Sequence, residues 1–533
     1  MADSNGQQYA GLEQMSTTKD FTFTNIVSLN YSKLFKDAHR LELGAFMEYM
    51  KAHYNASSFR QNGLNPKTWA FGAGTGYVAP DVVNNNYIPT VSAQKIDAGT
   101  LSYFGTLDYD YKERFGFAAV VRRDASYRFV DDNKWGTFWS VSGRWNIDQE
   151  QFMQNSGIDM LKLRASYGTQ GNQNVISPAY GTNPLFPGSN LVRDTNATGN
   201  GYDNIQGLAP AQIANTALRW EEIVQANVGL DFRLAKGRLE GNIDVYRKQT
   251  NELYFSIKRS AATGFYSQNG NNGKLRNSGV ELMLKYKLVD SNDFKLSVFA
   301  NGSYNKGEVV EIDIEDQSGE DLLTVPGQLT YEWQLIPYVG VNQSNGNLLF
   351  LDAAGNVTEN PNPTEDRRKT GKSLIPKYQG GFGFNADYKG FYSDVLFSWA
   401  KDVWKLDISN YWAYQLDFIG DDNVSADLLN AWTAANPTNF PSLDATNQNF
   451  SMDSDRFLND ASFLRLRSVS LGYSFPKKYL DNTFMDGLKL FVQGENLLLW
   501  SKWRGFDPEM FTAGTQSTYP NPRTISVGAS VQF

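Results

Sequence analysis

The last ten residues of the chain read TISVGASVQF, residues 524–533, and alternate strictly between apolar and small or polar side chains. Because successive side chains of a β-strand point to opposite faces, such a segment has one apolar and one polar face. About ten residues of tilted strand cross a bilayer core about 30 Å thick, with lipid on the apolar face and water on the other. A half-buried edge strand of a soluble protein shows the same alternation more often. The decapeptide alone therefore leaves both interpretations open.

The same alternation recurs along the whole chain, and this recurrence favours the membrane interpretation. Segments of membrane-crossing length with period 2 predict an all-β protein, a transmembrane antiparallel β-barrel of about 15 strands. The predicted strands are 20–32, 40–54, 100–112, 114–127, 136–147, 160–170, 223–234, 238–250, 277–289, 294–307, 378–388, 391–401, 463–475, 487–499 and 524–533.

Tight turns and long loops alternate between these strands. Turns such as Lys112-Glu113, Lys236-Gly237 and Lys389-Gly390 connect them at one end. Outer-membrane barrels have short periplasmic turns and long extracellular loops, whereas a propeller or sandwich has no reason to keep this parity. The final strand is then expected to end in the periplasm. The other end carries one short loop, 128–135, and long loops near 55–99, 171–222, 308–377, 402–462 and 500–523.

The polar faces of two neighbouring strands predict residues that line a lumen. In Val224–Leu234 and Leu239–Val245, charged and amide side chains alternate with aliphatic ones. A soluble core does not normally accept so many charges, because burying them is costly. The expected lumen-lining residues are Gln225, Asn227, Asp231, Glu240, Asn242 and Asp244.

Composition agrees with a barrel and argues against other classes. Aromatic residues make up 14% of the chain and there are 46 glycines, which favours strands, turns and aromatic girdles. The mean hydropathy is -0.46, and no apolar run approaches the length of a membrane-spanning helix. With no cysteine, only His39 and His53 as histidines and no hydrolase or zinc motif, we expect no enzyme activity. A net charge of -8 without a basic block argues against nucleic-acid binding.

Several motifs resemble the barrel of SusC-like TonB-dependent transporters, the SusC/RagA family. The resemblance covers nearly every predicted strand, and the motifs are specific when taken together. They include LKLRASYGTQGNQ at 161–173, RNSGVELMLKY at 276–286, PKYQGGFGFNADYKGF at 376–391, FLRLRSVSLGYSFPKK at 463–478 and GFDPE at 505–509.

The resemblance implies more than these residues contain. Members of the family have a signal peptide, a TonB box, and a plug inside a barrel of 22 strands, the number typical of plugged transporters. Residues 1–533 would then be the C-terminal part of the TonB-dependent receptor β-barrel, without the signal, TonB box, plug and first strands. Unpaired sheet edges are costly in lipid, so we expect the remaining N-terminal half of the barrel to complete it.

The resemblance also implies a function and partners. The expected function is active import, across the outer membrane of a Gram-negative bacterium, of a nutrient too large for porins, such as a glycan fragment or an oligopeptide. TonB would supply energy through the missing plug region, a SusD-like surface lipoprotein would close over the long loops, and outer-membrane lipid would surround the barrel. A passive porin or a surface adhesin barrel is the alternative.

Two clusters in the long loops are candidates for binding. Trp404, Tyr411, Trp412 and Tyr414 would stack on a sugar or face the lid, although an upper aromatic girdle accounts for them equally well. The acidic run Glu308–Asp321 offers enough oxygen ligands for Ca²⁺. Its spacing departs from that of an EF-hand loop, so a solvated loop is favoured and no cofactor is expected.

The C-terminal strands carry two further signals. In 463–475 the alternation changes phase after Leu466, which predicts a β-bulge near Arg467 or a strand that rises above the membrane. The last strand ends on an aromatic residue, and we expect Val531 and Phe533 to act as an outer-membrane assembly signal.

Overall fold

One antiparallel sheet of 15 strands dominates the computed structural model. The structure describes residues 11–65, 67–77, 89–173, 192, 194–200, 206–312, 322–323, 325–415, 420–481, 483–509 and 519–533. The sheet strands are β1 (Leu12–Phe35), β2 (His39–Asn62), β3 (Thr90–Tyr111), β4 (Phe115–Ser126), β5 (Trp135–Asn146), β6 (Ile158–Asn172), β9 (Glu221–Leu234), β10 (Leu239–Asn251), β13 (Lys274–Asp290), β14 (Phe294–Glu311), β21 (Tyr378–Tyr388), β22 (Phe391–Lys401), β25 (Phe463–Ser474), β26 (Gly487–Ser501) and β27 (Thr524–Gln532). Each predicted strand overlaps one of these, so the predicted strands are confirmed.

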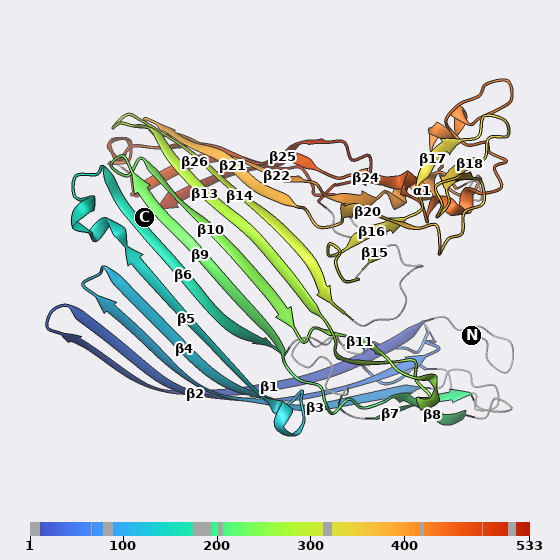
Figure 1. The fold of residues 1–533 in the computed structure, drawn as a ribbon, viewed down its shortest axis with the longest axis horizontal. Helices are drawn as coiled ribbons and strands as arrows, with labels where there is room; N and C mark the ends of the chain where they lie inside the picture. Colours follow the sequence, from blue (N-terminus) through green and yellow to red (C-terminus); the bar gives the residue numbers. More distant parts are fainter. Residues whose placement is uncertain are drawn as a thin grey trace.

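The strands follow one another around a curved wall in the order of the sequence (Figure 1). The short turns and the C-terminus lie together on the left of this view, and the long connections gather on the right. This arrangement confirms the predicted alternation of turns and loops. β1 and β27 are the edge strands, and within the described ranges neither pairs with a second strand.

Left-handed backbone conformations close the tight turns. Lys389 and Gly390 connect Tyr388 to Phe391 with φ angles of 49° and 94°. Positive φ at both central positions is typical of the type I′ turn, whose twist matches that of the flanking strands. The turns after β3 and β9 also contain residues with positive φ, among them Lys112 at 52°.

The first hairpin is longer than predicted. β1 and β2 pair without interruption from Leu12 opposite Asn62 to Phe35 opposite His39, and β3 begins at Thr90, inside the predicted loop 55–99. In the extensions Ser, Thr, Asn and Lys occupy both faces, so the sequence shows no alternation there. Backbone hydrogen bonds extend these strands even where the side-chain pattern gives no signal.

The predicted β-bulge at Arg467 is confirmed. Leu466 lies opposite Phe397 and Ser468 opposite Leu396, so Arg467 is the extra residue on β25. The extra residue reverses the phase of the strand, and the leucines and valines on both sides of it therefore share one face of the sheet.

The long connections carry their own small sheets. They contain β7 (Thr195–Asn200), β8 (Gln206–Gln212), β11 (Tyr254–Lys258), β12 (Ser267–Asn271), β15 (Leu322–Leu323), β16 (Glu332–Leu335), β17 (Tyr338–Val341), β18 (Leu348–Leu351), β19 (Val357–Thr358), β20 (Arg368–Ser373), β23 (Trp404–Leu406), β24 (Leu458–Asp460) and the helix α1 (Ile408–Ala413). In the part of the chain that is described, no helix is both long enough and apolar enough to cross a membrane.

The described residues of 325–377 and 402–462 pack against each other, and we call them the loop body. Trp333 Nε1 donates to the Trp404 backbone oxygen at 2.8 Å, and the Asn447 side chain bonds both backbone groups of Leu348. Trp333, Ile336 and Leu348 are at most 1% exposed. Among the described residues, the most deeply buried apolar side chains therefore lie largely in the longest loops, and the loop body covers the polar face of the sheet near β21 and β22.

Candidate functional site: the polar face and its pocket

The antiparallel register brings the predicted lumen-lining residues together. Asp231 lies opposite Asn242, and Asn227 lies opposite Tyr246. Opposed residues of neighbouring strands point to the same face of a sheet. The opposite face is apolar, with Val228 exposed at 53% and Val245 at 52%. The residues that share the polar face are Gln225, Asn227, Asp231, Glu240, Asn242 and Asp244, and their contact with water and substrate stays a prediction.

Arginine–carboxylate pairs tie the strands across this polar face. Arg164 of β6 binds both carboxylate oxygens of Asp231 on β9, at 2.8 and 2.9 Å, and reaches Asp244 of β10 at 3.1 Å. Gly229 lies between them, and a Cβ at this position would collide with Arg164 and Asp244. Further along, Arg144 of β5 pairs with Asp110 of β3. The sequence analysis selected the carboxylates and missed the arginines, although Arg164 stands in the LKLRASYG motif.

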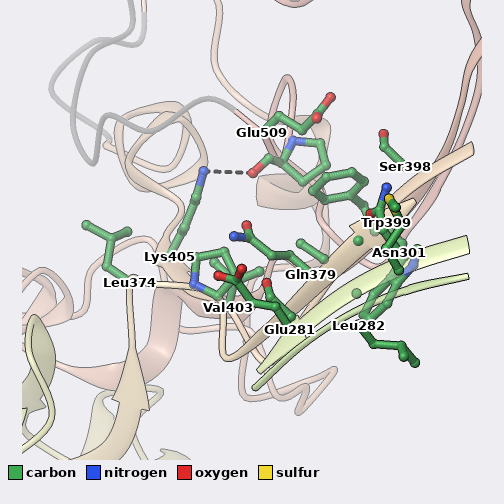
Figure 2. Close-up of a pocket in the computed structure, with 18 of the residues that line it drawn as sticks. Glu281, Leu282, Asn301, Leu374, Gln379, Ser398, Trp399, Val403, Lys405 and Glu509 are labelled. Carbon is green, nitrogen blue, oxygen red and sulfur yellow. Dashed lines mark hydrogen bonds between the residues drawn. The ribbon is translucent and has the colours of Figure 1, made fainter. Parts of the chain in front are cut away.

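A pocket of about 620 Å³ lies in the polar face beneath the loop body (Figure 2). The buried hydroxyl oxygen of Ser398 has no hydrogen-bond partner among the described residues. An unpaired buried polar group costs about 1–3 kcal/mol, so a ligand group that pairs with this hydroxyl gains affinity. Polar side chains from five neighbouring strands line the pocket: Asn242, Glu281, Asn301, Ser303, Gln379 and Ser398.

Two buried cations hold the segment 505–509, which forms the roof of the pocket. The Lys405 ammonium donates to the Pro508 backbone oxygen at 2.7 Å, and its burial lowers its pKa to about 8. Arg465 pairs with Asp507 at 2.5 Å, and both side chains are only 3% exposed. Breaking a buried pair by removing one partner leaves an uncompensated charge, at a cost of about 3–5 kcal/mol. The segment 505–509 is therefore fixed over the polar face.

This roof joins two motifs that are far apart in the sequence. Arg465 and Arg467 belong to FLRLRSVSLGYSFPKK and bind Asp507 and Glu509 of GFDPE. Sequence reasoning identified both motifs but not their contact. The sequence contained a signal for this contact. Two arginines at the change of phase and two carboxylates in a short motif were left without an assigned partner, and opposite charges can pair.

The candidate aromatic residues lie mostly inside the loop body. Tyr414 is 8% exposed and donates its hydroxyl to Asp427 at 2.5 Å. Trp404 and Tyr411 pack against the same hydrophobic cluster, which includes Trp333 and Phe457. Trp412 is the exposed member of the four, at 40%. A contact with ligand or lid stays a prediction, and the geometry favours Trp412 for it.

An arginine surrounded by aromatic rings joins the two parts of the loop body. The Arg456 guanidinium lies 5.0 Å from the centre of the Phe457 ring and 5.7 to 5.9 Å from three others. Its burial lowers its pKa, and Nη1 donates to Ser451 Oγ at 2.9 Å. The three other rings are those of Tyr338, Tyr414 and Phe440.

Two further predicted sites have different positions. Most of the acidic run, 313–321, lies outside the described residues, and no described group of three or more histidines and carboxylates is arranged to hold a metal. Val531 is on the apolar face opposite Leu488, and the ring of Phe533 stacks on Phe484 at 5.6 Å. The calcium site and the assembly signal both stay predictions.

A sheet with one apolar and one polar face, short turns at one end and long loops at the other defines a transmembrane antiparallel β-barrel. The chain belongs to the TonB-dependent receptor-like β-barrel family, whose model matches residues 2–497. This match confirms the fold class.

Individual relatives agree with this family. The TonB-dependent receptor P39 of Formosa agariphila is 28% identical over 98% of this chain and 54% of its own length. The TonB-dependent receptor SusC of Bacteroides thetaiotaomicron is 30% identical over 81% of this chain and 44% of its own length. The chain thus spans about half the length of the curated relatives it matches. The resemblance to SusC-like receptors is confirmed.

Solved structures of the RagAB peptide importer share the fold. The closed-closed state matches with a TM-score of 0.83 and 25% identity, over 100% of this chain and 58% of that chain. The open-open state matches with the same score and identity, over 98% of this chain and 55% of that chain.

Proposed function

We propose that this chain forms the C-terminal part of the barrel of an active importer in the outer membrane of a Gram-negative bacterium. The substrate would be a glycan fragment or an oligopeptide too large for porins. The match of the whole chain to the RagAB peptide importer, at a TM-score of 0.83, carries this proposal. A SusD-like lipoprotein would close over the long loops, and TonB would supply energy through a plug.

The two faces of the sheet suit such a path. Charged and amide side chains on the polar face keep water along the lumen, while Val228 and Val245 contact lipid on the other face. The pocket lies where the loop body meets the polar face, so a substrate released from the loops would reach it early. Its amide and hydroxyl groups would pair with peptide or sugar groups.

We propose further that polypeptide outside residues 1–533 completes the barrel. β1 and β27 each present one unpaired edge within the described ranges. In lipid every unpaired backbone group costs several kcal/mol, so both edges require additional strands. Expression of residues 1–533 alone should then give no heat-modifiable band on a gel, whereas co-expression with the upstream half should restore it.

Transport assays in the native host test the importer proposal. Deletion of this protein or of TonB should abolish uptake of fluorescent oligopeptides or glycan fragments. Planar-bilayer measurements on the assembled protein should show a blocked pore. Uptake that persists without TonB, together with a permanently conducting pore, would instead establish a passive porin.

A paired substitution tests the pocket. Gln379→Leu removes an amide from the pocket wall and should weaken uptake several-fold. Gln493→Leu removes an amide from the polar face of β26, outside the pocket, and should leave uptake unchanged. Equal uptake by both variants would show that the pocket does not contact the substrate.

A further inference from the structure

The apolar face of the sheet has a hollow near its short-turn end. On this face Ala386 of β21 lies directly opposite Ser393 of β22, so two small side chains stand side by side. Larger residues flank them along both strands, with Phe384 and Tyr388 on β21. The resulting hollow has a volume of about 670 Å³. The other side chains of the apolar face that line it are Phe391, Leu471, Tyr473, Leu490, Val492 and Val527.

Aromatic rings form the rim of the hollow on the side of the turns. Tyr388 is 53% exposed and Phe391 is 62% exposed. The rings of Phe391 and Tyr473 lie 4.4 Å apart. Tyrosine is typical of the membrane interface, where its ring contacts acyl chains and its hydroxyl reaches the headgroups. The rim therefore marks the depth at which headgroups begin.

Lysines stand just beyond this rim. Lys389 lies in the β21–β22 turn with its ammonium 5.5 Å from the Tyr388 ring, and Lys477 and Lys478 follow β25. The two segments are adjacent, since the Ser474 amide donates to the Gly390 oxygen at 2.7 Å. At about 3.3 Å per residue, Ala386 is about 10 Å along the strand from Lys389. This is the separation between a headgroup and the upper part of its acyl chain.

The lysines are available to an anion. Lys389 is 3.6 Å from Asp293 and Lys477 is 3.9 Å from Asp486, and both lysine side chains are more than half exposed. Exposed ion pairs of this kind contribute little to stability, so a phosphate competes easily with the aspartates. Positive charge at the rim and an apolar hollow below it match the two ends of a lipid.

We propose that this hollow binds one glycerophospholipid, with an acyl chain over Ala386 and Ser393 and the phosphate on the lysines of the rim. The short-turn end of an outer-membrane barrel faces the periplasm, so the lipid comes from the periplasmic leaflet. The site lies on the outer surface of the barrel and is separate from the path proposed for the substrate.

Native mass spectrometry of the complete protein, purified in mild detergent, tests this site. The wild type should carry a retained adduct with the mass of a phospholipid. The double variant Ala386→Leu with Ser393→Leu fills the hollow and should reduce the adduct at least five-fold. Ala226→Leu is the matched control, because Ala226 is exposed on the apolar face of β9, outside the hollow. Heat-modifiable mobility shows that each variant is folded.

A second pair of variants tests the headgroup contact. Lys389→Gln with Lys477→Gln should lower the retention of anionic phosphatidylglycerol added in mixed micelles. Lys112→Gln is a close control, since Lys112 also stands in a tight turn with positive φ and 5.6 Å from a tyrosine ring. Unchanged retention in the filled variant overturns the proposal. So does an adduct identified as lipid A, or a dimer that disappears on filling, because these would assign the hollow to the outer leaflet or to a second copy.

Discussion

The sheet and the loop body of this barrel hold together in different ways. In the sheet, apolar residues such as Val228 and Val527 are exposed at 53% and 80%, because this face contacts lipid. In the loop body, Trp333 and Phe350 are at most 1% exposed. The sheet depends on its backbone hydrogen-bond ladder and on half-exposed arginine pairs. The loop body depends on side-chain packing and resembles a small soluble domain.

This difference concerns what each region requires of a side chain. A position in the sheet requires the correct polarity for its face, and size matters less because lipid or water fills the remaining space. A position in the loop body requires a particular shape as well, since protein interiors are close-packed. Substitutions of size should therefore damage the loop body, whereas substitutions of charge should damage the sheet.

The largest effect is expected from Trp333→Ala. Removal of a buried tryptophan costs about 3–5 kcal/mol, and here it also removes the hydrogen bond to the Trp404 oxygen. Hydrogen exchange of the complete protein should show opening of 325–377 and 402–462 while the strands stay protected. Val280→Ala, exposed on the apolar face of β13 opposite Val245, is the control and should have little effect. Loss of protection throughout the sheet would show that the two regions are not independent.

The converse experiment places a charge on the sheet. Val228→Arg puts a cation on the lipid face in the middle of β9 and should destabilise the barrel by about 2–4 kcal/mol. Gln225→Arg, on the polar face of the same strand, should be tolerated. Outer-membrane levels and folding in urea measure both. Comparable levels of the two variants would contradict the assignment of the faces, and lower levels of Gln225→Arg would reverse it.

Sequence reasoning succeeded where one physical rule determines the structure. Period-2 alternation located the strands of the sheet, because lipid on one face and water on the other impose it on each of them. The change of phase at Arg467 located the bulge for the same reason. The rule fails where both faces meet water, and it therefore missed the extensions of β1 and β2.

The alternation of apolar and polar residues could not predict the pocket or its roof. They depend on contacts between residues far apart in the chain, such as Arg465 with Asp507 and Lys405 with Pro508. The register of the sheet fixes which strands are neighbours, but the return of a long loop onto them depends on packing. For the same reason the sequence could not show that Tyr414 is buried in the loop body.

The pH dependence of stability should distinguish Lys405, the buried lysine of the roof, from an exposed lysine. The pKa of Lys405 is lowered from 10.5 to about 8, so above pH 8 the unfolded loop binds more protons than the folded one. Stability should therefore rise with pH, by about 1 kcal/mol between pH 7 and 9 from this group. Lys405→Met should abolish this increment in the opening free energy of 402–462. Lys401→Met, exposed on β22, should retain it.

The smallest expected effect concerns Trp412, an exposed aromatic residue of α1 in the loop body. Of the four candidate aromatic residues, Trp412 presents the most surface. It can therefore contact a partner without any rearrangement of the core of the loop body. Trp412→Ala should weaken substrate capture or lid docking by about 0.5–1.5 kcal/mol, the value of one aromatic contact. The stability of the loop body should change less than in Tyr414→Ala, which creates a cavity. Binding measured by calorimetry and opening measured by hydrogen exchange separate the two effects. One pair of results would contradict this prediction: normal binding by Trp412→Ala, and a loss of binding by Tyr414→Ala that is fully explained by opening of the loop body. The aromatic cluster would then be a structural core, and recognition would lie elsewhere on the loops.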